Sequence, residues 1–286
     1  MKASEIGQVG RRLDRGRDST EALAITYLGQ VGFALQHRGV TIVIDPYLTD
    51  SADCTPSSPK GFWARNYPAP ITGGELTHVD LVLCSHDHLD HTDPGTLVEI
   101  SRSSPQALFA GPRKSVSVMK EGGIAESRLE TLNADGKPFR FGPVTIHPIA
   151  AAHETCEVDP DGYHAFLSFI VCWAGWTLFH AADTLCTPEL SVELAKFPRI
   201  DVAFLPINGR DAARQKLGIV GNMTSREAAS LAAQHRFGLV VPTHYDLFEA
   251  NRASLPDFVR DLEAADPFLA FKAFRPGEQI FLPSHL

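Results

Sequence analysis

Short runs of β-branched and aromatic residues, separated by glycine, fill the chain between residues 22 and 44. Runs of this length and composition predict strands, and the glycines between them predict tight turns. The predicted strands cover residues 22–28, 32–36 and 40–44. The third run ends in Asp45-Pro46, where the chain must leave the sheet because a residue before proline is conformationally restricted. The pattern therefore predicts a meander of hairpins.

From residue 79 onward, apolar runs alternate with segments that carry helix start signals. Asp93-Pro94 combines an N-cap carboxylate with proline at the first helical position. Thr224 and Glu227 form the T-x-x-E pattern of a capping box. Helices are predicted over residues 94–103, 113–121, 188–196, 225–235 and 256–264, and further strands over 79–84, 107–110, 144–149, 164–172, 177–179, 202–205, 239–241 and 279–282.

The predicted elements follow the same order twice: a group of strands comes first, and then strands alternate with helices. The amino-acid composition does not change between the two halves. Two similar halves that share one core, with two sheets inside and helices outside, would explain this order. We expect a single α/β domain over residues 22–286. Residues 1–21 are expected to form a polar, partly disordered extension.

Composition excludes several classes of protein. A net charge of −8 over 286 residues argues against a dedicated nucleic-acid binder, which normally has a basic face. Five cysteines without a CxxC pair predict reduced thiols and a cytoplasmic protein. The first residues lack the apolar core of a secretory signal, and no run approaches the length of a membrane span. We therefore expect a small-molecule substrate and neither a nucleic-acid nor a membrane partner, and assembly into a homo-oligomer is left open.

Residues 50–74 are rich in serine, proline and glycine, yet they include Phe62, Trp63 and Tyr67. Linkers rarely carry three aromatic side chains, so this segment is predicted to be a long excursion loop. Trp63 and Tyr67 could either cover a functional site or pack on the sheet.

The stretch CSHDHLDHTD, residues 84–93, places three histidines and three aspartates directly after a predicted buried strand. Side chains at i and i+2 of an extended segment point the same way, so His86 and His88 can reach one ion. Asp90 and His91 follow on the turn and can face a second ion. Imidazole and carboxylate ligands without thiolate suit Zn²⁺, Mn²⁺ or Fe²⁺. The alternative is a polar turn with exposed histidines.

A two-metal site needs more ligands than this stretch offers. His153, Asp183 and His244 are of ligand type, and each lies just beyond an apolar strand. Each one alone is interpreted more simply as an ordinary polar loop residue. Their shared position at strand ends, together with the HDHLDH cluster, favours a joint role as ligands.

The HDHLDH cluster with these three later residues resembles the metallo-β-lactamase fold superfamily. The resemblance implies a four-layer αββα sandwich with a dinuclear metal site at one rim of the sheets, holding zinc or manganese, with iron as a further option. It also implies roles: His86, His88 and His153 would hold the first metal, Asp90, His91 and His244 the second, Asp183 would bridge them, and Asp45 would orient the ligand loop.

Longer phrases carry a closer resemblance. Several longer segments of the chain resemble the L-ascorbate-6-phosphate lactonase family. They are "YLGQVGFAL", "IDPYLTDS", "DGYHAFLSFIV", "LPINGRD" and "GNMTSREAA" followed by "GLVVPTHYDLF". This resemblance implies a metal-dependent hydrolase in which two metal ions activate a hydroxide that attacks a small lactone or ester, including phosphorylated sugar-type lactones.

Other residues near the predicted strand ends are candidates for catalysis and substrate binding. Asp90 would position the attacking hydroxide, and His164 is the candidate general acid. Arg210 could clamp a phosphate or carboxylate through two parallel hydrogen bonds. Asn208 and Tyr245 are further candidates for substrate contact. His180 could contact Asp183 and hold it in place without binding a metal itself.

Two alternatives share this set of ligands. One is a metal-dependent phosphodiesterase, including the N-acyl-phosphatidylethanolamine phospholipase type. The other is a non-catalytic metal-binding sensor that kept the fold. A sensor of this kind usually loses a ligand, whereas all seven are present here.

Overall fold

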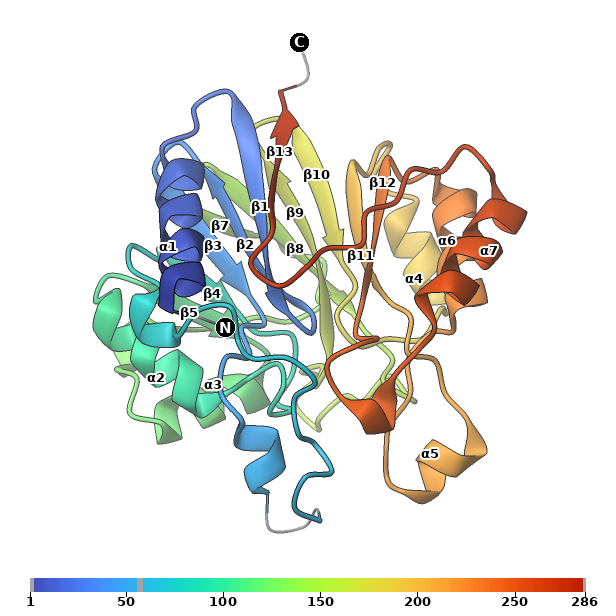
Figure 1. The fold of residues 1–286 in the computed structure, drawn as a ribbon, viewed down its shortest axis with the longest axis horizontal. Coiled ribbons are helices and arrows are strands. Elements are labelled where there is room, and N and C mark those ends of the chain that lie inside the picture. The colour runs from blue at the N-terminus through green and yellow to red at the C-terminus, as the bar shows by residue number, and fades with distance from the viewer. Residues whose placement is uncertain (1–2, 56–58, 285–286) are drawn as a thin grey trace. The chain divides into compact units, whose positions relative to one another are not determined.

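The computed structural model describes residues 3–55 and 59–284, with side chains from residue 8 onward. By its internal contacts the chain divides into two compact units, each of which contains its own sheet (Figure 1). The first unit comprises Met1–Leu132 together with Phe274–Leu286, and the second comprises Asn133–Ala273. The single domain expected over residues 22–286 stays a prediction.

The first unit contains a seven-stranded mixed sheet in the order β13-β1-β2-β3-β4-β5-β6. Its strands are β1 (Ala22–Gly29), β2 (Gly32–His37), β3 (Val40–Ile44), β4 (Leu81–Leu83), β5 (Leu108–Gly111), β6 (Leu129–Thr131) and β13 (Gln279–Pro283). Neighbours pair antiparallel from β13 to β3 and parallel from β3 to β6. Strands β1, β3, β4 and β5 consequently run in one direction, and the loops that follow them leave from the same edge of the sheet.

Three helices of this unit pack on one face of its sheet, as the blue-to-green part of Figure 1 shows. They are α1 (Ala3–Arg17), α2 (Pro94–Ser103) and α3 (Arg113–Glu121), and the short 3₁₀ helices are η1 (Ser51–Cys54), η2 (Gly73–Glu75) and η3 (Glu126–Arg128). Leu97, Ile100 and Met119 from the helices share one buried cluster with Val82 and Phe109 from the strands. This packing fixes the chain on both sides of the HDHLDH stretch.

Helix α1 corrects our expectation for the N-terminal segment. The described part, residues 3–17, is helical instead of disordered. Val9 and Leu13 are 3% and 7% exposed and join the core of the first unit. Their spacing of four residues puts both side chains on one helix face, where they can pack together. Arg17 also donates to Asp80 at 2.9 Å, which ties the end of the helix to the segment before β4.

The second unit contains a six-stranded mixed sheet in the order β12-β11-β10-β9-β8-β7. Its strands are β7 (Phe139–Phe141), β8 (Val144–Ala150), β9 (Leu167–Trp173), β10 (Trp176–His180), β11 (Val202–Pro206) and β12 (Leu239–Thr243). Neighbours pair antiparallel from β7 to β10 and parallel from β10 to β12. Strands β8, β10, β11 and β12 therefore all end at one edge of the sheet.

Helices of the second unit pack on one face of its sheet. They are α4 (Pro188–Leu194), α6 (Ser225–His235) and α7 (Leu255–Ala265). The short helix α5 (Ala212–Lys216) contains no buried residue, and the 3₁₀ helix η4 (Glu249–Asn251) lies between β12 and α7. Leu190, Leu231 and Phe258 from these helices contact a buried cluster that includes Phe179 and Val240 from the strands. The core thus lies beneath the strands whose ends carry the predicted ligands.

The local start signals found in the sequence are confirmed. Asp93 caps α2 with proline at the first turn, and Thr224 and Glu227 form both bonds of a capping box at α6. Strands β6 and β7 and helix α5 were not predicted from the sequence. These elements are short and largely accessible to solvent, so their residues show no periodic pattern of apolar positions. Among the described residues, no helix is long and apolar enough to cross a membrane.

Candidate metal centre

The HDHLDH stretch forms a tight turn between β4 and α2 in the first unit. The backbone amides of His91 and Thr92 both donate to the carbonyl of His88, at 3.0 and 2.8 Å. The imidazole centroid of His86 lies 4.6 Å from that of His88 and 4.0 Å from that of His91. The turn therefore gathers three imidazoles at the carboxyl end of a parallel strand.

A buried aspartate holds two of these imidazoles in place. Asp45 follows β3 and is fully buried. Its Oδ1 accepts from the amide of Ser85 at 2.7 Å, and its Oδ2 accepts from the Ser85 hydroxyl at 2.7 Å. The same Oδ2 lies 2.9 Å from Nδ1 of His91, while the Ser85 hydroxyl lies 3.0 Å from Nδ1 of His86.

This network sets the protonation of both rings. An ionised carboxylate can only accept hydrogen bonds, so Nδ1 of His91 must carry the proton that it donates to Asp45. The Ser85 hydroxyl gives its own proton to Asp45, so Nδ1 of His86 donates to Ser85 in turn. Both imidazoles then keep their lone pair on Nε2, the form in which a neutral histidine binds metal. Asp45 thus makes the contacts that an orienting role would need, and that role stays a prediction.

Asp90 completes the cluster of the first unit. Its Oδ2 lies 3.8 Å from Nε2 of His91 and accepts a hydrogen bond from the Gln30 side chain at 2.8 Å. The carboxylate is thus held beside the ring nitrogen of His91 that keeps its lone pair.

The second unit brings its three predicted ligands together. One oxygen of Asp183, Oδ2, lies 3.6 Å from Nε2 of His153 and 3.3 Å from Nε2 of His244. All three residues are at most 6% exposed. They follow strands β8, β10 and β12, which end at one edge of the sheet. The three residues lie far apart in the sequence, and they come close together in space because their strands end at the same edge of the sheet.

Hydrogen bonds from backbone amides join the loops that carry these candidate ligands. The amide of Ala152, next to His153, donates to the Thr184 hydroxyl at 3.1 Å, and the amide of Leu185 donates back to the carbonyl of Ala152 at 2.9 Å. Ala182 and His244 adopt left-handed backbone conformations, with φ of 52° and 56°. Such conformations are strained for residues other than glycine and tend to persist at functional sites.

The distances around Asp183 suit metal chelation better than direct hydrogen bonding. Hydrogen bonds between nitrogen and oxygen span about 2.7–3.2 Å. Two ligand atoms held at about 2.1 Å by one tetrahedral ion lie roughly 3.4 Å apart. The separations of 3.3 and 3.6 Å around Asp183 fall close to the second value. The imidazole and carboxylate donors of both clusters therefore fit divalent zinc, manganese or iron.

His164 lies at the start of the segment that leads into β9, where Asn133 binds it. Its Nδ1 lies 2.8 Å from Oδ1 of Asn133, and its backbone amide donates to the same oxygen at 2.9 Å. Partial burial lowers the pKa of His164. The ring is therefore mainly neutral at pH 7, which is unfavourable for a proton donor, and the role of His164 as general acid stays a prediction.

Asn208 belongs to a network of buried amides that the sequence did not reveal. Its side chain donates to Asn251 at 3.1 Å and accepts from Asn222 at 3.1 Å. Arg214 donates to the Asn208 carbonyl at 2.6 Å and to the Asn251 side chain at 3.0 Å. The network ties together the loops after β11 and β12. No local pattern marks these contacts, since the three asparagines are far apart in the sequence.

The structure gives Arg210 a partner within the protein. Both terminal nitrogens of Arg210 donate to the Glu227 carboxylate at 2.7 Å, and one also donates to the carbonyl of Asn222 at 3.0 Å. Glu227 is the residue that closes the capping box of α6. The clamp that we predicted for a substrate anion is thus formed with a carboxylate of the chain, and substrate binding by Arg210 stays a prediction.

We expect Arg210→Met to lower the free energy of unfolding at pH 7 by about 1 kcal/mol, because the two side chains are 35% and 34% exposed and solvent weakens their attraction. The hydrogen bonds from Arg210 lower the pKa of Glu227 to about 2. The pair therefore stabilises the fold above the ordinary glutamate pKa and loses this effect as the pH falls toward 2. Urea unfolding of both proteins at pH 7 and pH 3 should show the difference shrinking. Equal stabilities with a raised KM for an anionic substrate would instead indicate a substrate clamp.

Two further predicted residues are buried in the second unit. Tyr245 follows His244, but its ring joins the core beneath the helices, and burial raises its pKa. His180 ends β10 and is 1% exposed, with its ring 5.9 Å from that of Phe204. A substrate contact for Tyr245 and a supporting role for His180 stay predictions.

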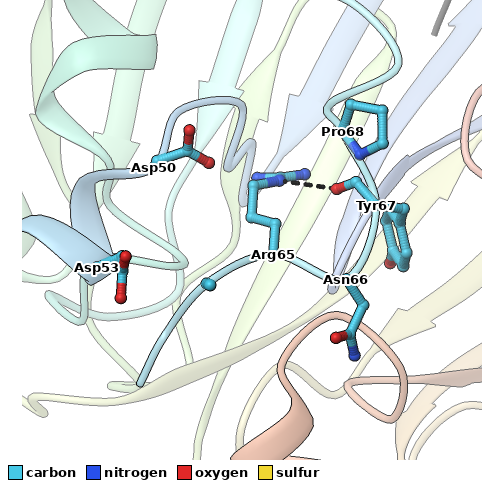
Figure 2. Close-up of a pocket in the computed structure, with 7 residues that line it drawn as sticks. Asp50, Asp53, Arg65, Asn66, Tyr67 and Pro68 are labelled. Atoms are coloured by element: carbon cyan, nitrogen blue, oxygen red, sulfur yellow. Dashed lines mark hydrogen bonds between the residues drawn. The ribbon is translucent and has the colours of Figure 1, made fainter. Parts of the chain in front are cut away.

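The excursion loop of the first unit borders a hollow of about 410 Å³ (Figure 2). Arg65 fixes the loop: it donates to the carbonyls of Tyr67, Tyr47 and Thr49 at 3.0–3.2 Å, and the first of these bonds is dashed in Figure 2. The Tyr67 hydroxyl lies 3.4 Å from that of Tyr27 in β1. Tyr67 therefore contacts strand β1, and a role for it in covering a functional site stays a prediction.

Known proteins resemble this chain along most of its length. The family model described as a beta-lactamase superfamily domain matches residues 41–245. A UPF0173 metal-dependent hydrolase of Caldivirga maquilingensis is 25% identical over 259 residues, which cover 91% of this chain and 98% of the relative. Another, of Pyrobaculum islandicum, is 28% identical over 258 residues, covering 90% and 99%. The solved structure of Igni18, a metallo hydrolase from Ignicoccus hospitalis, has a TM-score of 0.67 at 24% identity and covers 91% of this chain and 98% of its own.

The family match spans more than half of the chain and contains all seven predicted ligands, from His86 to His244. The predicted metallo-β-lactamase fold is confirmed, with two mixed sheets and their helices. The chain belongs to the beta-lactamase superfamily.

Proposed function

We propose that this chain is a metal-dependent hydrolase that acts on a small lactone or ester, including phosphorylated sugar-type lactones. The observation that carries the proposal is the Asp183 oxygen that faces two imidazoles at 3.3 and 3.6 Å. A buried carboxylate shared between two neutral ligands suits a position between metal ions, since cations would offset the cost of burying its charge.

Both clusters would supply ligands to one centre of two divalent ions. We assign His86, His88 and His153 to the first ion, Asp90, His91 and His244 to the second, and Asp183 to both. When bound, two such ions would lower the pKa of a shared water and polarise the bond under attack.

The chain's own residues prepare this chemistry. Asp45 and Ser85 hold His86 and His91 in the tautomer that presents Nε2. Asp90 is the group proposed to orient the attacking water. His164, neutral near pH 7, is the residue proposed to exchange a proton with the leaving group, and it would need to take up a proton before it could donate one.

The relatives support the hydrolase class, because two proteins that match nearly the whole chain are named metal-dependent hydrolases. Their names give no substrate. The choice of a lactone rests on the long phrases that resemble the L-ascorbate-6-phosphate lactonase family, which include the turn Gly29–Gly32 and the segment before His244.

The test combines metal analysis with a substrate panel. Protein purified without added metal is analysed for bound elements, before and after exposure to zinc or manganese. The same samples are then assayed against phosphorylated and plain lactones and against phosphodiesters. His86→Ala serves as the variant without a complete site.

About two metals per chain with metal-dependent lactone turnover would support the proposal. Two metals with phosphodiester cleavage alone would replace the substrate class with the phosphodiesterase alternative. Metal binding without turnover of any substrate would favour the sensor alternative, and a lack of metal binding after zinc or manganese is supplied would refute the site itself.

A further inference from the structure

The turn between β1 and β2 delivers a side chain to Asp90. Gln30 is 1% exposed, and its Nε2 donates to Oδ2 of Asp90 at 2.8 Å. The two residues are sixty positions apart in the sequence. They meet because β1 and β4 run in the same direction, so that the loops after both strands leave from one edge of the sheet.

The backbone of Gln30 is held in an unfavourable conformation. Its φ is 56°, in the left-handed region that side chains other than glycine, asparagine and aspartate rarely enter. Such a conformation is strained and persists only where its surroundings determine it. Simple reversal of the chain would not require a buried glutamine here.

Two tyrosine hydroxyls fix this turn. Tyr27 from β1 donates to the carbonyl of Gln30 at 3.1 Å, and the Gln30 amide donates to the hydroxyl of Tyr67 at 3.5 Å. Tyr67 belongs to the loop that borders the hollow in Figure 2. The backbone of Gln30 is thus held from both sides, which leaves its side chain little choice of direction.

We propose that Gln30 is a positioning residue that fixes the carboxylate of Asp90 for metal binding, an inference that rests on the proposed role of Asp90 as a ligand. The Asp90 side chain is 18% exposed, whereas Gln30, which donates to it, is 1% exposed. A carboxylate has about four acceptor positions, so one bond to Gln30 leaves others for a metal. A neutral amide donor also leaves the negative charge of Asp90 intact.

The test compares two identical substitutions at two buried glutamines of the same unit. Gln30→Met removes the donor to Asp90 while keeping the length of the side chain. Gln36→Met is the control, because Gln36 is 2% exposed and donates to the Thr41 hydroxyl at 3.1 Å. Zinc dissociation constants are measured by competition with a chromophoric chelator. We expect Gln30→Met to weaken zinc binding by about 10–100-fold, the usual loss for a residue that supports a ligand, and Gln36→Met to leave it unchanged.

A second pair of variants separates positioning from general damage to the fold. In an Asp90→Ala background, Gln30→Met should cause no further loss of zinc affinity, since its target is gone. An equal loss in both backgrounds, or wild-type affinity in Gln30→Met alone, would overturn the inference. Failure of the wild-type protein to bind zinc would instead refute the proposed function, so the two failures are distinguishable.

Discussion

Replacing Asp183 with asparagine is expected to lower kcat/KM by about 10³-fold, which corresponds to roughly 4 kcal/mol of transition-state stabilisation. The asparagine side chain would have nearly the same size but would lack the negative charge that faces His153 and His244. A neutral amide cannot offset two cations, so one metal should be lost. Elemental analysis should therefore show bound metal falling from about two per chain toward one, in parallel with the loss of activity.

Asp201→Asn is the matched control for this experiment. Asp201 is a second buried aspartate of the same unit, and it accepts a hydrogen bond from the amide of Thr177 at 2.8 Å. It precedes β11 and so lies at the edge of the sheet opposite the ligands. Equal losses of activity in both variants would point to destabilisation of the unit instead of a role in metal binding, and a fully active Asp183→Asn protein would contradict the site.

The candidate ligand residues can be identified from the sequence because they occupy a position that topology makes recognisable. His153, Asp183 and His244 each follow an apolar run that proves to be a strand. Parallel strands end at a common edge, so side chains just beyond them converge even when they are far apart in the chain. The HDHLDH motif adds a local signal that needs no knowledge of the fold.

The residues that hold the candidate site residues in place carry no comparable signal. Gln30 lies in a glycine-flanked turn that predicts an ordinary hairpin, and its purpose emerges only from its contact with Asp90. Asn222 and Asn251 become partners of Asn208 only once the loops after two strands are folded. Long-range hydrogen bonds between polar side chains follow no period along the sequence. They are therefore visible only in the structure.

Arg210 shows why a correct chemical interpretation can still mislead about the partner of a residue. A planar guanidinium does recognise a carboxylate through two parallel bonds here, as its chemistry predicts. The carboxylate belongs to Glu227, seventeen residues further along the chain. The sequence indicates the kind of group that Arg210 binds, whereas the fold decides which member of that class is nearest.

Asp45→Asn is expected to weaken zinc binding by about 10–100-fold through the tautomer of His91, although Asp45 is assigned no metal contact of its own. Asparagine can still accept the hydrogen bond from the Ser85 amide through its carbonyl oxygen. Its amide group would then face Nδ1 of His91 at the place where Oδ2 now lies 2.9 Å away. Two donors would meet, so the ring would move its proton to Nε2 and lose the lone pair required for metal binding.

The control and the second readout make this prediction specific. Asp80→Asn alters another aspartate of the same sheet, which accepts from the amide of Thr41 at 2.8 Å and from Arg17 at 2.9 Å and for which we assign no role in metal binding. It should leave zinc affinity unchanged. Nitrogen-15 NMR of the histidine rings should show the proton of His91 on Nδ1 in the wild-type protein and on Nε2 in Asp45→Asn. Unchanged zinc affinity in Asp45→Asn would mean that the Ser85 hydroxyl, 3.2 Å from the same nitrogen, suffices to set the tautomer.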